Sequence, residues 1–326
     1  MTIVLTGVAG FIGFHAASAL LDQGFAVLGI DDLNTYYDTS LKNDRLAQLT
    51  GREGFTFAKA SVDNREAMTA ALGELEEVSE IIHLAAQAGV RYSLVDPYSY
   101  VSSNVMGHVV MCELARSCPN IRHFVYASSS SVYGLSDENL YSLADRADAP
   151  ASLYAATKRS DELISHSYSH IYDIPMTGLR FFTVYGPWGR PDMAYFSFTK
   201  AIIEEQPITL YNHGRMQRDF TYIDDIVQGI LAAVQTPPPS SGGTRHRLFN
   251  LGNNRPAKLG RFVSILEEAI GKKAIVELGP MMPGDVVSTV ADITESRDVL
   301  GFEPKTPLEE GLPNFVSWYK KYYKSN

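Results

Sequence analysis

A glycine-rich turn near the start of the chain constrains the fold more than any other feature. Residues 3–5 form a short apolar run, and Gly7, Gly10 and Gly13 follow it. Such a run is typical of a buried strand, and the apolar stretch from there to residue 21 is typical of a helix. Glycines between a strand and a helix permit a tight turn in which a pyrophosphate sits on the helix N-terminus. The segment therefore predicts a dinucleotide site. The alternative is a loop of small residues that only caps a helix.

The second predicted strand, residues 26–30, indicates which dinucleotide is bound. It ends in Asp31 and Asp32. A carboxylate roughly 20 residues beyond the glycines can accept a hydrogen bond from a ribose 2′-hydroxyl. Neither Arg nor Lys stands there to pair with a 2′-phosphate. The sequence therefore predicts NAD rather than NADP.

Strand and helix patterns alternate through the first half of the chain. Further strands are predicted at residues 55–57, 80–84, 123–126 and 176–179, and helices at 64–72, 97–116 and 152–172. This alternation predicts an α/β protein built on a doubly wound parallel sheet of the Rossmann type. Ligands of such sheets bind beyond the carboxyl ends of the strands.

The regular alternation ends after residue 183. The run at 185–191 (YGPWGRP) predicts a rigid irregular loop, and 237–243 (PPPSSGG) a mobile surface loop. Helices are predicted at 258–270 and 308–322. We expect residues 1–183, with 220–252 returning, to form an NAD-binding Rossmann domain. Residues 184–219 and 253–326 are expected to form a smaller C-terminal α/β lobe that binds a nucleotide sugar.

The composition of the chain indicates which kinds of partner and which cellular compartment to expect. The chain has 326 residues, is 45% apolar and carries a net charge of −9. This charge speaks against nucleic acid as the main partner. No stretch of 18 uninterrupted apolar residues predicts a membrane span, and nothing basic precedes residue 3 as in a signal peptide. The only cysteines, Cys112 and Cys118, form no ligand pattern, which favours a reducing, cytoplasmic location.

The histidines do not predict a metal site. His166 and His170 lie four positions apart on a predicted helix, without a third ligand nearby. Zinc sites normally use three or four protein ligands, so a surface pair is the better interpretation. His83 lies in an apolar strand and is expected to be a hydrogen-bonded core residue.

A Tyr-x-x-x-Lys pair, Tyr154 and Lys158, lies 25 positions after Ser129. Residues four apart on a helix share one face, and a neighbouring cation favours the ionised phenol. A bound oxidised nicotinamide would act in the same direction. Such a tyrosine can take the proton of an alcohol while a hydride leaves the same carbon. A solvated surface pair is the alternative, and the dinucleotide site argues against it.

Six segments carry a resemblance to a known family. They are residues 34–38 (NTYYD), 83–93 (HLAAQAGVRYS), 128–134 (SSSSVYG), 152–158 (SLYAATK), 179–193 (LRFFTVYGPWGRPDM) and 218–225 (RDFTYIDD). Almost end to end, the chain resembles the extended short-chain dehydrogenase/reductases, and within them the UDP-glucuronate 4-epimerases. The glycine turn is specific only to the superfamily, whereas the run at 186–193 is much more discriminating.

The resemblance implies a function and the residues that serve it. The enzyme would interconvert UDP-glucuronate and UDP-galacturonate by transient oxidation at C4 with bound NAD, with Ser129, Tyr154 and Lys158 as catalytic residues. Expected cofactor contacts are Gly7, Gly10, Phe11, Ile12, Gly13, Asp31, Asp32, Asn34, Ser61, Val62, Leu84, Ala85, Ala86, Asn104, Tyr154, Lys158 and Phe181. Expected substrate contacts are Val90, Arg91, Ser93, Ser129, Ser130, Ser131, Thr183, Arg190, Arg218 and Asp285. A homodimer through the helices near 97–116 and 152–172 is also implied.

Several positions bear on specificity within the family. Relatives often place an Asp that contacts adenine where Ser61 stands, so either Asp63 compensates or that contact is weaker. Decarboxylases of UDP-glucuronate place a Glu at the position of Ser131, and galactose epimerases usually place an Asn at that of Thr183. A serine cannot relay a proton as a carboxylic acid can, but its hydroxyl can donate to a substrate carboxylate.

Alternatives remain open at two arginines and for the activity itself. For Arg190 the alternatives are a residue that binds the substrate carboxylate and a solvated loop residue. For Arg218 they are a residue that binds the diphosphate and a partner of Asp219 in an ion pair. Arginine suits bidentate phosphate contact, although it is mostly a surface residue. The alternative functions are a UDP-glucose/UDP-galactose 4-epimerase, a UDP-glucuronate decarboxylase, and a non-catalytic NAD-binding regulator. The last would not need Ser129, Tyr154 and Lys158 together.

Overall fold

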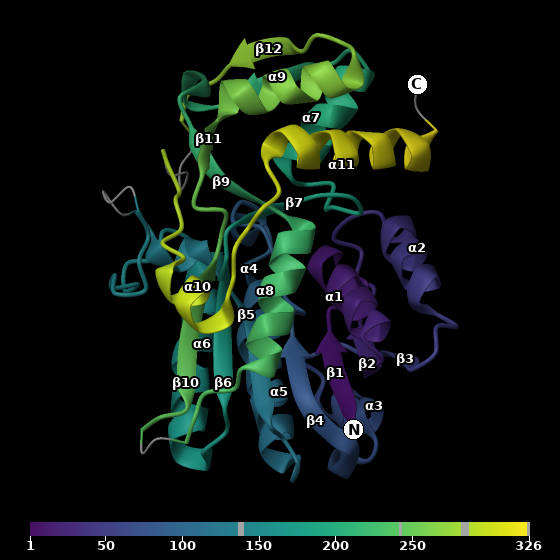
Figure 1. Cartoon of the computed structure of the whole chain (residues 1–326), viewed down its shortest axis with the longest axis vertical. Coiled ribbons are helices and arrows are strands. Elements are labelled where there is room, and N and C mark those ends of the chain that lie inside the picture. The colour runs from purple at the N-terminus through teal and green to yellow at the C-terminus, as the bar shows by residue number, and fades with distance from the viewer. Residues whose placement is uncertain (136–139, 241–242, 282–286, 325–326) are drawn as a thin grey trace.

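A seven-stranded parallel sheet forms the centre of the molecule (Figure 1). The computed structural model describes residues 1–135, 140–240, 243–281 and 287–324. The sheet has the order β10-β6-β5-β4-β1-β2-β3. Its strands are β1 (Thr2–Thr6), β2 (Ala26–Asp31), β3 (Phe55–Lys59), β4 (Val78–His83), β5 (His123–Ser129), β6 (Met176–Phe181) and β10 (His246–Leu251). The predicted doubly wound α/β fold is confirmed.

Helices cover both faces of this sheet, because successive side chains of a strand point to opposite faces. In β1, Val4 packs into the apolar layer that holds α3 and α5, whereas Leu5 packs into the layer that holds α1, α2 and α8. The helices around the sheet are α1 (Phe11–Asp22), α2 (Thr39–Leu49), α3 (Arg65–Leu72), α4 (Pro97–Tyr100), α5 (Gly107–Ser117), α6 (Leu153–Tyr172) and α8 (Ile223–Gln235).

The strand order places a topological switch point between β1 and β4. From β1 the chain proceeds through β2 to β3 on one side, then returns to β4 and continues to β5 and β6 on the other. A crevice opens at such a point, beyond the carboxyl ends of the strands. The segments that begin at Gly7 and Leu84 leave β1 and β4 there.

Among the described residues, two small sheets and four further α-helices lie at the top of Figure 1 and along its left side. One sheet has the order β11-β9-β7 and the other pairs β12 with β8. The elements are β7 (Thr183–Tyr185), α7 (Ala194–Ile203), β8 (Pro207–Leu210), β9 (Gln217–Tyr222), β11 (Pro256–Lys258), α9 (Leu259–Ile270), β12 (Ile275–Leu278), α10 (Thr294–Leu300) and α11 (Leu308–Tyr323). Trp318 and Tyr322 of α11 pack on Trp188 at ring separations of 5.2 and 5.1 Å.

Some elements differ from the sequence-based prediction. The helix predicted at 97–116 contains a π-helical segment, Val101–Met106, between α4 and α5. No helix was predicted at α2, because its apolar residues are few; in the structure four of its eleven residues are buried. In the predicted surface loop, residues 237–240 and 243 have no regular structure, and residues 241–242 lie outside the described part of the chain.

Candidate active site

The glycine turn closes directly on the segment that follows β4. Gly7 has a φ of +74°, and a Cβ built on it would lie 2.8 Å from the backbone nitrogen of Ala85. A Cβ on Gly13 would lie 2.0 Å from the carbonyl oxygen of Gly7. Neither position can hold a side chain without displacing backbone. Gly10 is the N-cap of α1 and offers no side chain, so the first N–H groups of that helix are left for a ligand.

Asp31, at the end of β2, both supports this turn and suits a ribose. Its Oδ2 accepts from the Ala9 N–H at 3.0 Å and its Oδ1 from the Leu33 N–H at 2.8 Å. Burial raises the pKa of this carboxyl, which is 7% exposed. Each carboxylate oxygen has more than one acceptor position, so a ribose hydroxyl can still bind. The contact to Ala9 was not predicted from sequence.

A cavity of about 400 Å³ lies at the switch point and collects most of the predicted cofactor residues. Its lining includes Gly7, Gly10, Phe11, Ile12, Gly13, Asp31, Asp32, Asn34, Val62, Leu84, Ala85, Ala86, Tyr154, Lys158 and Phe181. Lys42 and Tyr37 also line it and were not predicted. The glycine turn, the open helix N-terminus and the acidic end of β2 fit the pyrophosphate and ribose of NAD.

Ser61 and Asn104 are the predicted cofactor residues that do not line this cavity. Ser61 donates to Asp63 at 2.5 Å, and Ser102 donates to the other oxygen of the same carboxylate. Asp63 is therefore held by two hydroxyls. Asn104 lies in the π-helical segment, behind the cavity wall.

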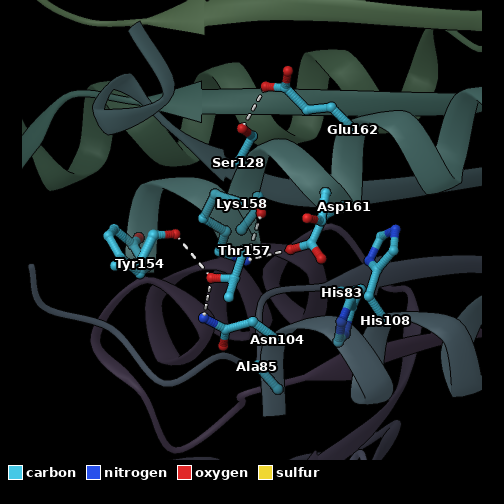
Figure 2. Close-up of polar contacts among 12 residues, drawn as sticks. His83, Ala85, Asn104, His108, Ser128, Tyr154, Thr157, Lys158, Asp161 and Glu162 are labelled. Atoms are coloured by element: carbon cyan, nitrogen blue, oxygen red, sulfur yellow. Dashed lines mark hydrogen bonds and ion pairs between the residues drawn. The ribbon is translucent and has the colours of Figure 1, made fainter. Parts of the chain in front are cut away.

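Asn104 ties three segments of the site together (Figure 2). Its side chain exchanges hydrogen bonds with the backbone of Gln87, at 2.8 and 3.1 Å, and donates to Thr157 Oγ1 at 3.0 Å. The segment after β4 is thereby fixed to helix α6. π-helical turns occur frequently at functional sites, and this one aims a buried amide at the helix of the Tyr-x-x-x-Lys pair.

Tyr154 and Lys158 lie on the first turns of α6, on the face turned toward the cavity. Ser152 caps this helix by accepting from the Ala155 N–H at 3.1 Å. The ring of Tyr154 meets that of Tyr100 edge to face at 6.0 Å. Ser129, at the end of β5, lines the same cavity and donates to Ser131 Oγ at 3.1 Å. The three predicted catalytic residues are thus brought together.

Lys158 is buried, with 3% of its side chain exposed. Its Nζ donates to the carbonyl oxygen of Ala127 at 2.9 Å and to Asp161 Oδ2 at 3.0 Å. An ammonium has three donors, so one remains for a cofactor hydroxyl or for Tyr154. Figure 2 shows Lys158 and Asp161 beside Thr157 on the same helix.

A second cavity, of about 960 Å³, adjoins the first. Both are lined by Tyr36, Gly89, Val90, Thr183, Arg190 and Met193. The predicted substrate residues Ser130 and Ser131 line only the first cavity, whereas Arg91 and Arg218 line only the second. Thr183 and Arg190 therefore lie where the two cavities meet.

Arg190 forms a bidentate ion pair. Its Nε lies 3.0 Å from Asp192 Oδ1 and its Nη2 lies 2.6 Å from Oδ2. The hydroxyl of Tyr36 donates to the same carboxylate at 3.3 Å. The Arg190 side chain is 23% exposed. Arg190 is therefore not a freely solvated loop arginine in the structure.

The remaining predicted substrate residues are placed as follows. Arg218 donates to the carbonyl oxygen of Gln217 at 2.8 Å, and the Asp219 carboxylate accepts from backbone N–H groups of Asn253, Asn254 and Ala291. Arg91 stacks over the ring of Tyr211 at 4.7 Å. Ser93 is buried and donates to the carbonyl oxygen of Val90 at 2.6 Å, without lining either cavity. Asp285 lies outside the described residues.

Arg45 of α2 is a site residue that the sequence analysis missed. It is fully buried and donates to carbonyl oxygens of Ala9 at 2.9 Å, Trp188 at 2.6 Å and Gly189 at 3.0 Å. It therefore ties the glycine turn to the loop that carries Arg190. The signal was its helical spacing with two buried leucines, Leu41 and Leu49, which places a charge on an apolar stripe.

No histidine or cysteine of the described residues lines either cavity. His83 is buried and bonded to Thr6 Oγ1 at 2.7 Å, as predicted for a core residue. Cys112 and Cys118 are buried free thiols. Within the described part of the chain, no group of three or more His, Cys, Asp or Glu could hold a metal ion, and no helix there is long and apolar enough to span a membrane.

Comparison with known proteins places this geometry in context. The model of the NAD dependent epimerase/dehydratase family matches residues 3–252. The chain is 47% identical over 337 residues to UDP-glucuronate 4-epimerase 4 of Arabidopsis thaliana, with 100% of this chain and 77% of that protein covered. It is 46% identical to the "Probable UDP-glucuronate 4-epimerase" of Rhizobium meliloti, covering 99% and 98% of the two chains.

A solved structure is similar in both fold and sequence. It is the UDP-glucuronic acid 4-epimerase of Bacillus cereus in complex with UDP-glucuronic acid and NAD. The TM-score is 0.90 at 33% sequence identity, and the alignment covers 99% of this chain and 100% of the other.

Proposed function

The chain belongs to the NAD dependent epimerase/dehydratase family, and from this premise we propose that it is a UDP-glucuronate 4-epimerase. It interconverts UDP-glucuronate and UDP-galacturonate and uses NAD as a resident cofactor. The named relatives and the solved neighbour with UDP-glucuronic acid and NAD support this activity.

One structural observation carries the proposal. The cavity that holds Ser129, Tyr154 and Lys158 opens into the cavity that holds Arg91 and Arg218, and Thr183 and Arg190 stand at the junction. A UDP-sugar laid across the two cavities would place its diphosphate beside arginine and its sugar beside Tyr154. The uronate carboxylate would then lie close to the junction.

The reaction follows from the side chains around the sugar. Tyr154 takes the proton of the 4-hydroxyl as general base. Ser129 donates a hydrogen bond to the same oxygen and steadies the ketone that forms. Lys158 supplies the positive charge that favours the ionised phenol. Bound NAD supplies the hydride acceptor for C4 and, after the 4-keto sugar has turned over about its link to the diphosphate, the hydride donor.

The enzyme must also protect its intermediate. Oxidation of glucuronate at C4 gives a β-keto acid, which loses carbon dioxide when its carboxylate is desolvated or its C5–C6 bond aligns with the ketone. Thr183, Ser130 and Ser131 can donate to that carboxylate and hold its charge, with Arg190 as a further donor. Serine at position 131 provides no carboxylic acid to assist carbon loss.

The division of the chain into two parts fits this arrangement. We place NAD on residues 1–183 and 220–252, since β10 joins the seven-stranded sheet and α8 packs on its helix layer. Residues 184–219 and 253–326 carry the two small sheets and the nucleotide-sugar side of the second cavity. The carboxylate of Asp31 disfavours NADP, because it would repel a 2′-phosphate.

We further propose a homodimer in which α4, α5 and α6 meet a second copy. Both α4 and α5 contact α6. The large apolar side chains exposed by α4, by the π-helical segment 101–106 and by α6 are Tyr98, Val101, Met106, Leu163, Ile171 and Tyr172. Large exposed apolar side chains on neighbouring helices support an interface at this face.

Light scattering of the wild-type protein should give the mass of a dimer. Leu163→Glu should reduce this mass to that of a monomer, whereas the control Val299→Glu on α10 should leave it unchanged. A monomeric wild-type protein would refute this.

Product analysis of Thr183→Val tests the proposed function. The wild-type enzyme should convert UDP-glucuronate mainly to UDP-galacturonate, with little UDP-pentose. The substitution keeps the side-chain volume but removes the hydroxyl, so it should weaken UDP-glucuronate binding about 10-fold, as for loss of one hydrogen bond to a charged group, and raise the pentose fraction. Mass spectrometry of both mixtures distinguishes the products.

A matched control is Thr199→Val, a buried threonine of α7 that lines neither cavity. It should leave the product ratio unchanged. If the wild-type enzyme formed mainly UDP-pentose, the protein would be a decarboxylase, and strong preference for UDP-glucose would make it a hexose epimerase. The names of the relatives favour neither outcome.

A further inference from the structure

Asp161 is a buried carboxylate beside the active site that the proposed mechanism does not use. It follows Lys158 by three positions on α6, and the two side chains are 1% and 3% exposed. Its Oδ2 accepts from Lys158 Nζ at 3.0 Å. Its Oδ1 is buried and has no hydrogen-bond partner among the described residues. A carboxylate left half-satisfied in the interior is costly, which points to a role for its charge.

The other ionisable groups around Asp161 come from four elements. They are His83 on β4, His108 and Cys112 on α5, Tyr126 on β5, and Glu162 on α6 itself. Burial lowers the pKa of both histidines and raises that of the thiol and the phenol. These four groups are therefore neutral near pH 7.

Glu162 is charged but is engaged elsewhere. Its two oxygens accept from Arg180 at 2.8 and 2.9 Å, and Arg159 donates to Oε2 at 2.7 Å. Among the described residues, Asp161 is thus the anion that directly opposes the Lys158 ammonium. Burial raises the pKa of Asp161 to about 6, against the lowering effect of Lys158. Above this pH the pair is an ion pair, and below it the carboxyl is protonated.

We propose that Asp161 is a positioning residue: it holds the Lys158 ammonium and, by offsetting part of its charge, sets the pH at which Tyr154 becomes a base. With the Ala127 carbonyl it fixes two of the three ammonium donors, so the third is directed toward the cavity. That Tyr154 is the base rests on the proposed function. The electrostatic interaction of Asp161 and Lys158 with Tyr154 does not.

The sign of the effect follows from the charges. Tyr154 also faces the Arg190 guanidinium and the Tyr100 hydroxyl, which a substitution at Asp161 leaves unchanged. Ionised Asp161 offsets part of the Lys158 charge, so its removal is expected to favour the ionised phenol. Asp161→Asn keeps an acceptor oxygen and the volume but removes the charge. The Tyr154 titration should therefore move to lower pH by roughly one unit, which is the effect of one charge roughly 10 Å away (the length of seven helical residues) at an effective dielectric of about 20.

The experiment is an ultraviolet tyrosinate titration of the protein stripped of nucleotide. The Tyr154 signal is taken as the difference between each protein and its Tyr154→Phe counterpart. Asp161→Asn is expected to lower the midpoint of the Tyr154 titration. Asp161→Ser should do the same and serves as a second variant if Asp161→Asn does not fold. The acid limb of kcat/KM should move in the same direction as the midpoint.

Asp225→Asn is the matched control, because this buried carboxylate binds the backbone N–H groups of Lys305 and Thr306 away from both cavities. It should leave the titration unchanged. A folded Asp161→Asn protein with an unchanged Tyr154 midpoint would overturn the inference. Since the titration needs neither substrate nor turnover, that failure is distinguishable from failure of the proposed epimerase activity.

Discussion

Replacing Tyr154 with Phe is expected to lower turnover of UDP-glucuronate at least about 100-fold, which is the usual contribution of a general base. The substitution keeps the ring that packs edge to face on Tyr100 and removes only the ionisable oxygen. The folded state and the NAD content should therefore be retained. Initial rates and the nucleotide released on denaturation measure both quantities.

Tyr168→Phe provides the matched control for this result. Tyr168 lies on the same helix, and its hydroxyl donates to Glu113 at 2.7 Å outside the cavities. Its loss should leave the turnover close to that of the wild-type enzyme. Near-wild-type activity of Tyr154→Phe would show that another group takes the proton.

Replacing Arg218 with Ala is expected to weaken all UDP-sugars together. Its guanidinium lies in the second cavity, away from Tyr154, and we assign it to the diphosphate. Hydrogen bonds to charged groups contribute about 1.5–3 kcal/mol, which corresponds to a loss of roughly 10- to 150-fold in binding. Binding of UDP, UDP-glucuronate and UDP-glucose, measured by calorimetry, should fall by similar factors.

Arg215→Ala is the control for Arg218, since Arg215 is an exposed arginine three positions earlier that lines neither cavity. It should change the three affinities little. A selective defect of Arg218→Ala toward UDP-glucuronate would instead place that arginine at the carboxylate.

The sheet could be predicted from sequence because its signals are local. Each strand of the first half is a short apolar run between turn residues, and the glycines after β1 are required by a turn that a Cβ at Gly13 would block. Helix α2 escaped prediction because it has few apolar residues and the interactions that hold it are long-range. Arg45, on its buried side, reaches carbonyl oxygens up to 144 positions away. The π-helical segment within 97–116 also has no local signal.

The candidate site likewise combines residues with local sequence signals and residues held by long-range contacts. The Tyr154–Lys158 pair and the acidic end of β2 follow fixed spacings, and the structure brings them into one cavity. Arg190 and Asp192 lie two positions apart, but the Tyr36 hydroxyl that donates to the same carboxylate lies 156 positions from Asp192. Asp161 is a different case: its spacing from Lys158 is local, but only the packed interior shows that its carboxylate is buried against the ammonium.

The most direct test of the account is to follow the hydrogen at C4. UDP-glucuronate carrying deuterium at C4 is converted by the purified enzyme, and the product is examined by mass spectrometry and NMR. The account predicts UDP-galacturonate that retains deuterium at C4, because the hydride removed from one face is returned to the other within the closed site. UDP-galacturonate whose C4 hydrogen came from water would contradict it.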